Sequence, residues 1–482
     1  MTHWSEEYIL NPSVYDEMRD EGGNIRIPYE KVDEYIRRFN TASFLAKEKL
    51  ADSLFLNRGI TFTVYSEKEG IERIFPFDII PRVITKSEWE RIEQGIKQRL
   101  RALNLFLKDI YHGQQILKDK VIPAELIASC PHFNREVYGI NVPHDIYVHI
   151  SGIDLIRDSN GEFFILEDNL RTPSGVSYML ENREITKRIF PDLLSNNKVK
   201  SISDYPMLLQ RVLTSVAPPR AVGNPTAVLL TPGMYNSAYY EHTYLAKYMG
   251  IMLVEGRDLV VDNHKLYMKS TSGLQQVDVI YRRVDDDFLD PLVFKPDSTL
   301  GVAGLMNVYR KGNVNIVNAV GNGVADDKAV YVYVPDMIKY YLNEEPILRN
   351  VPTYRMENKD ELEYAIANFE KMVFKKTNES GGYGLVMGDK VSGEEAQKTI
   401  QAIREEPRQF IAQPIISLST APCFIDDKLQ GRHVDLRPYA LCGPQGIDIV
   451  PGGLTRVALR EGSKVVNSSQ GGGSKDTWVL NE

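Results

Sequence analysis

The segment from 146 to 169 contains two strand-like runs joined by Asn160-Gly161, and this feature constrains the fold more than any other in the chain. Asn-Gly between two such runs is a strong signal for a β-hairpin with a two-residue type I′ turn. With these residues at the centre of the turn, the register places Asp154 opposite Glu167. Asn169 then shares a face with Glu167, because side chains alternate along a strand.

Opposed carboxylates destabilise a sheet unless a positive charge lies between them, since their Cβ atoms are only about 4.5 to 5.5 Å apart. Asp154, Glu167 and Asn169 would supply three oxygen ligands of the kind that Mg²⁺ prefers. A hairpin whose carboxylates merely face water is the alternative. The neighbouring residues are apolar: Ile153, Leu155, Phe163, Phe164, Ile165 and Leu166. They favour the metal site, because unpaired charges are costly in a partly buried hairpin.

Two further regions predict regular structure. Between residues 201 and 330, four short apolar runs (TAVLLTPG, IMLVEG, VDVIYRR and NVNIVNAVGNG) alternate with helix-like segments, which is typical of a parallel, Rossmann-like sheet. The turn GNGVAD lacks the full dinucleotide fingerprint, which argues against a nicotinamide site. Residues 86 to 112 repeat apolar side chains at three- and four-residue steps before Gly113 and predict a core helix.

Length, charge and cysteine usage narrow the class of protein. The 482 residues suffice for about three domains. A net charge of −8 argues against a nucleic-acid binder, which needs a basic face. No run approaches the roughly 18 apolar residues of a membrane span, and Cys130, Cys423 and Cys442 show no paired spacing. We therefore expect a cytoplasmic protein without nucleic-acid or membrane partners, and its oligomeric state stays open.

A glycine-rich segment follows a strand that carries a lysine. Lys375 lies on the strand-like MVFKK, and SGGYG at 380–384 precedes a second strand. The backbone N–H groups of Gly381, Gly382 and Gly384 would approach phosphate oxygens, while the lysine supplies a point charge. A plain glycine turn is the alternative. The segment is not a P-loop, because no Gly-Lys-Ser/Thr ends it.

The strand-like QFIAQPIISL contains Gln413, Pro414 and Ile415. Because Pro414 cannot donate to a sheet ladder, the strand ends there or lies at an edge. Backbone groups exposed at this break would read an adenine edge, and an ordinary core strand is the alternative.

Two arginines, Arg437 and Arg456, occur in strand contexts. Their forked guanidinium groups would clamp a phosphate or a carboxylate. Structural pairing, for instance with Asp435 or Glu461, is the alternative and is stronger for either arginine taken alone.

Together these elements resemble the ATP-grasp superfamily, which includes D-alanine:D-alanine ligase, glutathione synthetase and glutathionylspermidine synthetase. The nucleotide-binding parts follow in the usual order from 325 to 473: ADDK with Lys328, Lys375, SGGYG, AQPII, DLR, LTRVA and NSSQGGG. The acidic element that normally ends the domain comes early instead, as Asp154 and Glu167-Asp168-Asn169. This displacement indicates a circular permutation.

Four longer strings resemble the circularly permuted ATP-grasp family of type 2, which is similar to glutathionylspermidine synthetase: LEDNLRTPSGVSYMLENR, YEHTYLAKYMGIMLVEGRDL, IYRRVDDDFLDP and NSSQGGGSKDTWV. The resemblance implies an α/β (α+β) fold with permuted segments and a Rossmann-like pre-ATP-grasp domain. We expect a mainly helical region at 1–140, the metal-binding hairpin segment at 141–200, the Rossmann-like domain at 201–330 and the nucleotide-binding lobes at 331–482.

The resemblance also implies a carboxylate-amine ligase. The γ-phosphate of ATP moves to a small-molecule or peptide carboxylate, and an amine attacks the acylphosphate to give an amide, ADP and phosphate. ATP and Mg²⁺, with two ions, are the implied cofactors. Lys328 and Lys375 would hold the α- and β-phosphates, and the implied catalytic residues are Arg437, Arg456 and Asn467. Gln413 departs from the glutamate that other adenine hinges often have.

Substrate selection would involve the Rossmann-like part, where Arg282, Arg283, Asp285 and Asp286 follow a predicted strand end. A salt-bridged surface loop is the alternative. Two other functions stay open, namely a phosphotransferase with a stable phosphorylated product and a non-catalytic, nucleotide-responsive binding protein. The retained lysines and carboxylates argue against the second.

Overall fold

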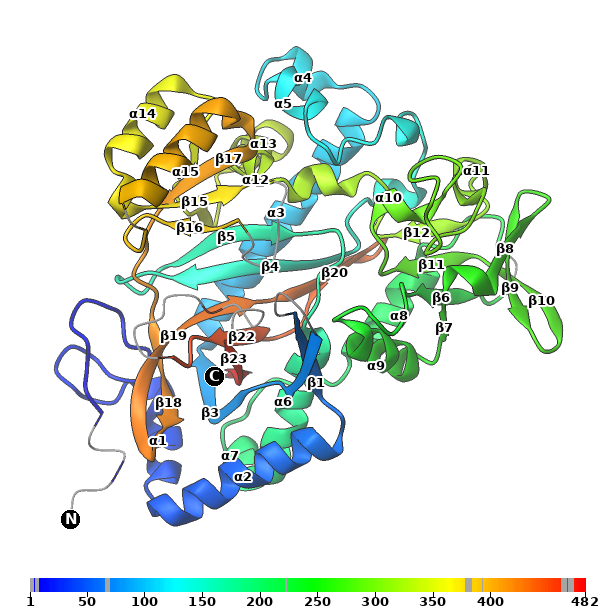
Figure 1. Ribbon diagram of the computed structural model, residues 1–482. Coiled ribbons are helices and arrows are strands. Elements are labelled where there is room, and N and C mark those ends of the chain that lie inside the picture. The colour runs from blue at the N-terminus through cyan, green and yellow to red at the C-terminus, as the bar shows by residue number, and fades with distance from the viewer. Residues whose placement is uncertain are drawn as a thin grey trace.

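The computed structural model describes residues 4, 8–65, 70–221, 223–377, 384–391, 393–460, 466 and 472–482. These residues form a mixed α/β structure with a ten-stranded sheet, a four-stranded parallel sheet and a four-stranded antiparallel sheet (Figure 1). The predicted α/β class is confirmed. Within the described ranges, every helix is too short or too polar to cross a membrane.

The ten-stranded sheet joins strands from both halves of the chain. Its main path is β13 (Arg349–Asn350), β5 (Phe163–Asn169), β4 (Ile150–Arg157), β19 (Lys428–Arg437), β22 (Leu454–Val457), β23 (Gly473–Val479) and β3 (Phe77–Ile84). Off this path, β18 (Thr420–Ile425) pairs with β19, and β20 (Tyr439–Gly443) pairs with both β4 and β21 (Gly446–Ile449). The predicted hairpin therefore lies beside strands near the C-terminus, with Leu155 opposite Leu436.

The predicted core helix is α3 (Lys86–Ile110), which begins at a capping box formed by Thr85 and Glu88. Its buried side chains recur at the predicted spacing, and α13 (Val334–Leu342) packs against it. Arg99 extends from α3 to the face of β5 that carries the buried Asp168. Its Nε and Nη2 donate to the Asp168 carboxylate at 2.7 and 2.6 Å. This ion pair holds α3 against the face of the hairpin opposite Glu167.

The Rossmann-like sheet is parallel, with the order β12 (Asn315–Val317), β11 (Val279–Arg282), β6 (Ala227–Leu230) and β7 (Met252–Val254). All four predicted strands are confirmed, and α9 (Tyr239–Met249) is the predicted helix between β6 and β7. A three-stranded arm of β8 (Leu259–Asp262), β9 (Lys265–Ser270) and β10 (Gly273–Val277) projects from it (Figure 1).

The antiparallel sheet forms a small lobe with its own core. Its order is β14 (Tyr354–Arg355), β17 (Phe410–Pro414), β15 (Met372–Lys376) and β16 (Val386–Met387). Two helices, α14 (Lys359–Ala367) and α15 (Gly393–Glu405), lie over it (Figure 1). Phe374, Ala412 and Ile403 are among the residues of a hydrophobic cluster confined to this lobe. Ile411 of β17 packs into the main core instead and joins the lobe to the rest of the molecule.

The remaining helices and strands surround these sheets. The helices are α1 (Glu30–Ile36), α2 (Thr41–Asn57), α4 (Gln115–Lys118), α5 (Ala124–Ala128), α6 (Val176–Ile189), α7 (Pro191–Asn196), α8 (Tyr205–Ser215), α10 (Asp286–Leu289), α11 (Leu305–Arg310) and α12 (Lys328–Tyr331). The strands β1 (Thr61–Tyr65) and β2 (Gly70–Ile74) pair only with each other among the described strands.

The Arg99–Asp168 pair yields a stability prediction. Arg99→Met leaves a buried carboxylate without its partner, so we expect the free energy of unfolding to fall by about 3 to 5 kcal/mol. Arg91→Met on the same helix is the matched control, because Arg91 forms an exposed pair with Glu162, and its loss should cost less than about 1 kcal/mol. Urea denaturation followed by circular dichroism measures both. Equal effects of the two substitutions would contradict a structural role for the buried pair.

Candidate functional site

The turn of the β4–β5 hairpin differs from the predicted type I′ turn. The N–H of Asp158 donates to the carbonyl of Glu162 at 3.0 Å, so the loop contains three residues rather than two. Gly161 takes a φ of +83°, which is the left-handed position that closes a three-residue hairpin loop. The prediction of a two-residue turn at Asn160-Gly161 is therefore wrong, and strand pairs next to the loop are displaced by one residue.

A bulge in β5 removes this displacement before the charged residues are reached. Leu155 pairs with Ile165, whereas Asp154 pairs with Glu167, so Leu166 is the extra residue. The predicted opposition of Asp154 and Glu167 is thus confirmed. It arises because the extra loop residue and the extra residue in β5 shift the register by one in opposite directions.

Two arginines supply the positive charge beside Asp154. Arg437 donates through Nε and Nη2 to the two carboxylate oxygens at 2.5 and 2.8 Å, and Arg456 donates through Nη2 to Oδ2 at 2.7 Å. Burial alone would raise the pKa of Asp154, but these guanidinium groups hold it well below its usual range. The positive charge that the sequence argument requires beside Asp154 is therefore supplied by two arginines of neighbouring strands, and a contact of Asp154 with Mg²⁺ stays a prediction.

Arg456 also pairs with Asp435, which lies opposite it on β19. Arg437 Nη1 reaches the carbonyl of Ser174 at 3.3 Å. The structural pairing weighed in the sequence analysis is therefore present, with Asp154 and Asp435 as partners. Direct contact of either arginine with a phosphate stays a prediction.

Glu167 is the accessible carboxylate of the opposed pair. Its side chain is 23% exposed, whereas that of Asp154 is 1% exposed. Lys328 Nζ lies 3.6 Å from Glu167 Oε2, and Asn169 Nδ2 lies 3.4 Å from Oε1. Lys328 and the hairpin residues Glu167 and Asn169, from two distant parts of the chain, thus meet at one carboxylate.

Lys375 lies on β15, as predicted, opposite Ile411. Burial, helped by the charges of Lys328 and Arg456 and opposed by those of Glu167 and Asp154, lowers the pKa of Lys375 to about 8. The amine is therefore within the electrostatic field of both hairpin carboxylates. A common nucleotide site of Lys328, Lys375 and Glu167 stays a prediction that this proximity favours.

The structure describes only some of the other residues that were predicted to bind nucleotide. Gln413 is buried on β17, and its side-chain amide donates to Thr353 Oγ1 at 2.9 Å. The strand ends at Pro414 as predicted, and the N–H of Ile415 donates to the carbonyl of Lys371 at 2.8 Å. Gly384 has a φ of +66°, whereas Gly381, Gly382 and Asn467 lie outside the described residues.

The arginines proposed for substrate selection are buried in structural bonds. Arg282 donates to the carbonyl of Asn318 at 2.8 Å. Arg283 donates to the carbonyl of Pro173 at 2.6 Å and pairs with Glu241. A surface loop is therefore wrong for both residues, and a direct substrate contact stays a prediction.

Sequence reasoning missed two aspartates that hold the backbone segments next to Asn169 and Lys328. Asp326 accepts hydrogen bonds at 2.6 Å from the Leu170 N–H and from Arg171 Nε, and so fixes the chain just after Asn169. Asp327 caps α12, the helix that begins at Lys328. An aspartate immediately before a helix is a recognised start signal, so the Asp-Asp-Lys triplet contained the second role.

Comparison with known proteins identifies the family. Residues 81–458 match the family described as circularly permuted ATP-grasp type 2. The chain belongs to this family. An uncharacterized protein of Synechocystis is 50% identical over 97% of both chains. A Frankia alni protein with a provisional glutamate–cysteine ligase name is 38% identical over 97% of this chain and 54% of its own length.

The fold of this permuted ATP-grasp protein has a solved counterpart. A glutathione synthetase-like effector of Globodera pallida, in its apo form, superposes with a TM-score of 0.59 over 92% of this chain and 98% of its own. The sequences are 11% identical, so this likeness shows the fold alone. The predicted permuted ATP-grasp fold is confirmed by the family match together with this likeness.

Family membership implies that ATP binds, usually together with Mg²⁺. The oxygen donors of the hairpin fit a Mg²⁺ ion that ATP also coordinates. No three His, Cys, Asp or Glu side chains gather into a metal-binding group within the described ranges. Glu167 and Asn169 nevertheless offer adjacent oxygen donors on one face of β5. Mg²⁺ is commonly held by one or two carboxylates plus substrate phosphates, so a small protein donor set suits an ion shared with ATP.

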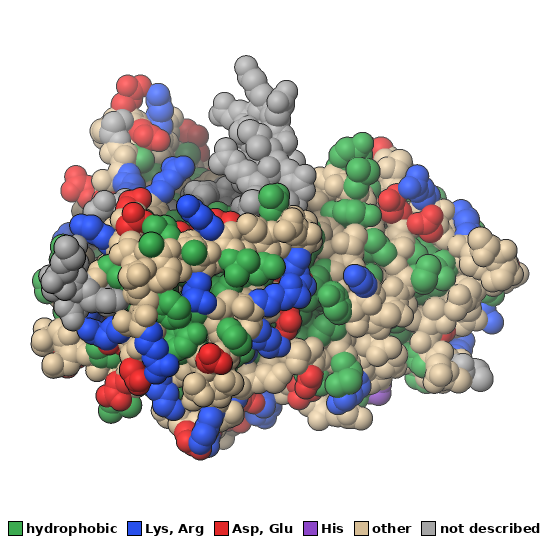
Figure 2. Space-filling model, turned by 90° about the horizontal axis from the view of Figure 1, so that it is seen from below, with side chains coloured by type: hydrophobic (Ala, Val, Ile, Leu, Met, Phe, Trp, Pro, Cys, Tyr) green, Lys and Arg blue, Asp and Glu red, His purple; other side chains and the backbone are tan. Residues whose placement is uncertain are grey.

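The charge pattern of the surface adds little to this site. Figure 2 shows Lys and Arg side chains interspersed with Asp and Glu side chains on the face in view. The positive groups that matter here, Lys328 and Lys375, lie beside the hairpin carboxylates instead.

The lowered pKa of Lys375 predicts how ATP affinity depends on pH. A protonated lysine attracts phosphate, so affinity should fall as the pH rises above about 8, by up to roughly tenfold per pH unit. Lys375→Met should weaken ATP binding at neutral pH and flatten this dependence. Lys376→Met, at the next position of the same strand, should keep it. Isothermal titration between pH 6.5 and 9.5 measures all three proteins, and an unchanged pH profile in Lys375→Met would assign the effect to another group.

Proposed function

We propose that this protein is an ATP-dependent ligase that activates a carboxylate as an acylphosphate and joins it to an amine. Membership of the circularly permuted ATP-grasp family supports an ATP-dependent ligase in general. The observation that carries the finer proposal is that Lys328 lies 3.6 Å from Glu167, while the Lys328 N–H donates to Thr377, two residues after Lys375. Phosphate-binding cations and an accessible metal-binding carboxylate are needed together for phosphoryl transfer.

In this proposal the two lysines hold the α- and β-phosphates, as the family order implies. Glu167 and Asn169, with Asp154 behind them, would hold Mg²⁺, which neutralises phosphate charge and aligns the transfer. The family resemblance implies that backbone groups of Gly381, Gly382 and Gly384 would close over ATP and exclude water, which would otherwise hydrolyse the acylphosphate; Gly381 and Gly382 lie outside the described residues.

The arginines act from fixed positions. Asp154 and Asp435 hold Arg437 and Arg456 in place, so neither guanidinium needs to reorganise when charge develops on the transferring phosphoryl group. Asn467, outside the described residues, completes the proposed catalytic set.

The chemistry balances in two steps. A carboxylate oxygen attacks the γ-phosphorus, the bond from that phosphorus to the β–γ bridging oxygen breaks, and ADP leaves. The amine nitrogen then attacks the acyl carbon, loses a proton, and phosphate leaves with the electrons of the acyl C–O bond. The products are an amide, ADP and inorganic phosphate.

We base the proposed substrate class on the name of one relative. The provisional glutamate–cysteine ligase name of the Frankia protein suggests amino-acid-like acid and amine substrates. This chain spans about half of that protein, so we propose a small-molecule or peptide carboxylate and an amine without naming either. Dependence on ATP supports the predicted cytoplasmic location.

Hydroxylamine trapping tests the acylphosphate. With Mg²⁺, ATP and a panel of amino acids and short peptides, but with hydroxylamine as the nucleophile, the protein should yield a hydroxamate and ADP. Glu167→Gln should reduce the yield by at least about a hundredfold, because the accessible anionic ligand is lost. Glu162→Gln, at the exposed end of the same hairpin, should leave it unchanged. Mass spectrometry and nucleotide chromatography measure the products.

Other outcomes separate the alternatives. A stable phosphorylated product without hydroxamate would indicate a phosphotransferase. Release of AMP and pyrophosphate would rule out the acylphosphate route.

A further inference from the structure

We propose that Arg408 is a positioning residue that fixes the two phosphate-binding lysines relative to each other. It does so by joining the root of the glycine-rich segment to the cap of the helix that begins at Lys328. The inference rests on the proposed function, because it assumes that Lys328 and Lys375 hold phosphates.

The first half of this junction is the carboxylate of Asp327. Its Oδ1 accepts the N–H groups of Ala329 and Val330 at 2.8 and 3.4 Å, and so caps α12. Its Oδ2 accepts from Arg408 Nη2 at 3.2 Å and from Cys130 Sγ at 3.4 Å. The Asp327 side chain is fully buried, so its charge requires the guanidinium partner. The residue that fixes the start of α12 is thus held by an arginine of the small lobe.

The second half of the junction is Thr377, which follows Lys375 by two residues and directly precedes the 378–383 segment. Arg408 Nη1 donates to Thr377 Oγ1 at 3.3 Å. The Thr377 N–H donates to the carbonyl of Gln409 at 2.9 Å, and its carbonyl accepts the Lys328 N–H at 3.2 Å. The backbone segments that carry Lys328 and Lys375 are therefore hydrogen-bonded to each other at Thr377. Arg408 contacts the side chains of Thr377 and Asp327 on either side of this bond.

One guanidinium reaches three separate elements. Besides Asp327 and Thr377, Arg408 donates through Nε to Ser129 Oγ at 3.1 Å, just after α5. A planar fork with five donors can do this at once, whereas the single ammonium of a lysine cannot. Because the small lobe has its own core, such a contact helps to fix where Lys375 lies relative to Lys328, together with Ile411, which packs into the main core.

Removal of this side chain causes no steric clash, although the buried Asp327 carboxylate then lacks its guanidinium partner and the protein should lose some stability. A cavity of about 460 Å³ opens beside it, lined among others by Ser129, Thr377 and Arg408. A shorter or apolar side chain at 408 therefore meets open space instead of a packed core, and its effect should fall on the alignment of the lysines.

A double-mutant cycle tests the inference, with ATP and Mg²⁺ as the titrated probe. Arg408→Met should weaken ATP binding about tenfold in the otherwise unchanged protein, but less than roughly twofold in the Lys328→Met background. A residue that acts through Lys328 loses its effect once Lys328 is gone. Arg408→Lys should recover only part of the loss.

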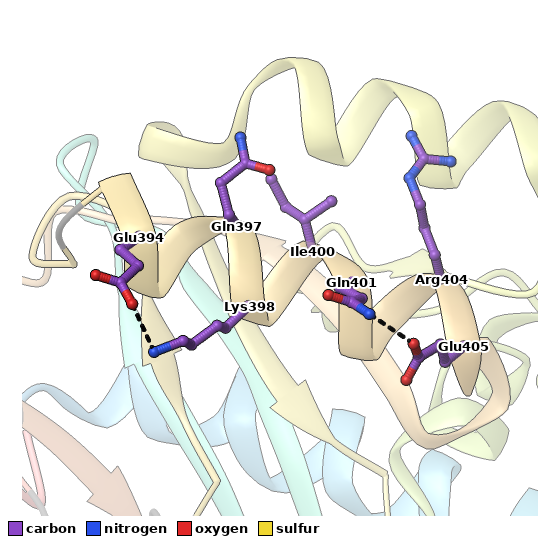
Figure 3. A pocket seen from close by; sticks show the side chains of 7 residues that line it. All are labelled: Glu394, Gln397, Lys398, Ile400, Gln401, Arg404 and Glu405. Atoms are coloured by element: carbon purple, nitrogen blue, oxygen red, sulfur yellow. Dashed lines mark hydrogen bonds and ion pairs between the residues drawn. The ribbon is translucent and has the colours of Figure 1, made fainter.

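Arg404→Met is the matched control. Arg404 belongs to the same lobe and extends from α15 toward the neighbouring helix (Figure 3), where it forms an exposed ion pair with Glu363 at 2.7 Å. This substitution should leave ATP affinity unchanged in both backgrounds.

The contradicting results are distinct. Equal losses from Arg408→Met in the two backgrounds would show an independent effect and overturn the positioning role. If Lys328→Met itself leaves ATP affinity unchanged, the proposed nucleotide site is wrong and the inference falls with it. Should Arg408→Met not fold, Asp327→Asn replaces it in the same cycle, because the amide oxygen still caps α12 while the charge facing Arg408 is lost.

Discussion

The candidate site depends on a buried charge network that joins three strands. Asp154 on β4 receives Arg437 of β19 and Arg456 of β22, and Arg456 also pairs with Asp435. In a buried setting, removing one member would leave an uncompensated charge, so the network holds these strands in one arrangement. The hairpin face that carries Glu167 and Asn169 is fixed by this arrangement, and Lys375 approaches it from the small lobe.

The same network explains why the order of segments along the chain can change without loss of the site. The contacts between Asp154 and the two arginines link residues 283 and 302 positions apart. Electrostatic and hydrogen-bonding contacts depend on distance in space and not on sequence separation. A hairpin placed before the Rossmann-like sheet can therefore reach the position that it would have at the end of an unpermuted domain.

Local pattern was sufficient for much of the fold. The helix from Lys86 to Ile110 followed from apolar spacing, because one buried face must recur at helical steps. The parallel strands around β6 and β11 followed from short apolar runs between helices. Both signals are local and survive any arrangement of the rest of the chain. Asp154 opposite Glu167 was also predicted, although the turn and the bulge that produce this register were not.

Contiguous motifs were enough to predict the family and the strands of the parallel sheet, and the residues assigned to the site stay a prediction. Which charged side chains face one another depends on how the sheets and lobes pack. Three charged residues find their partners on elements far apart in sequence: Asp154 faces Arg437 and Arg456, Arg283 faces Glu241, and Asp327 faces Arg408. No local pattern encodes such a pairing, since a guanidinium selects its partner by proximity and burial once the sheets and lobes have packed.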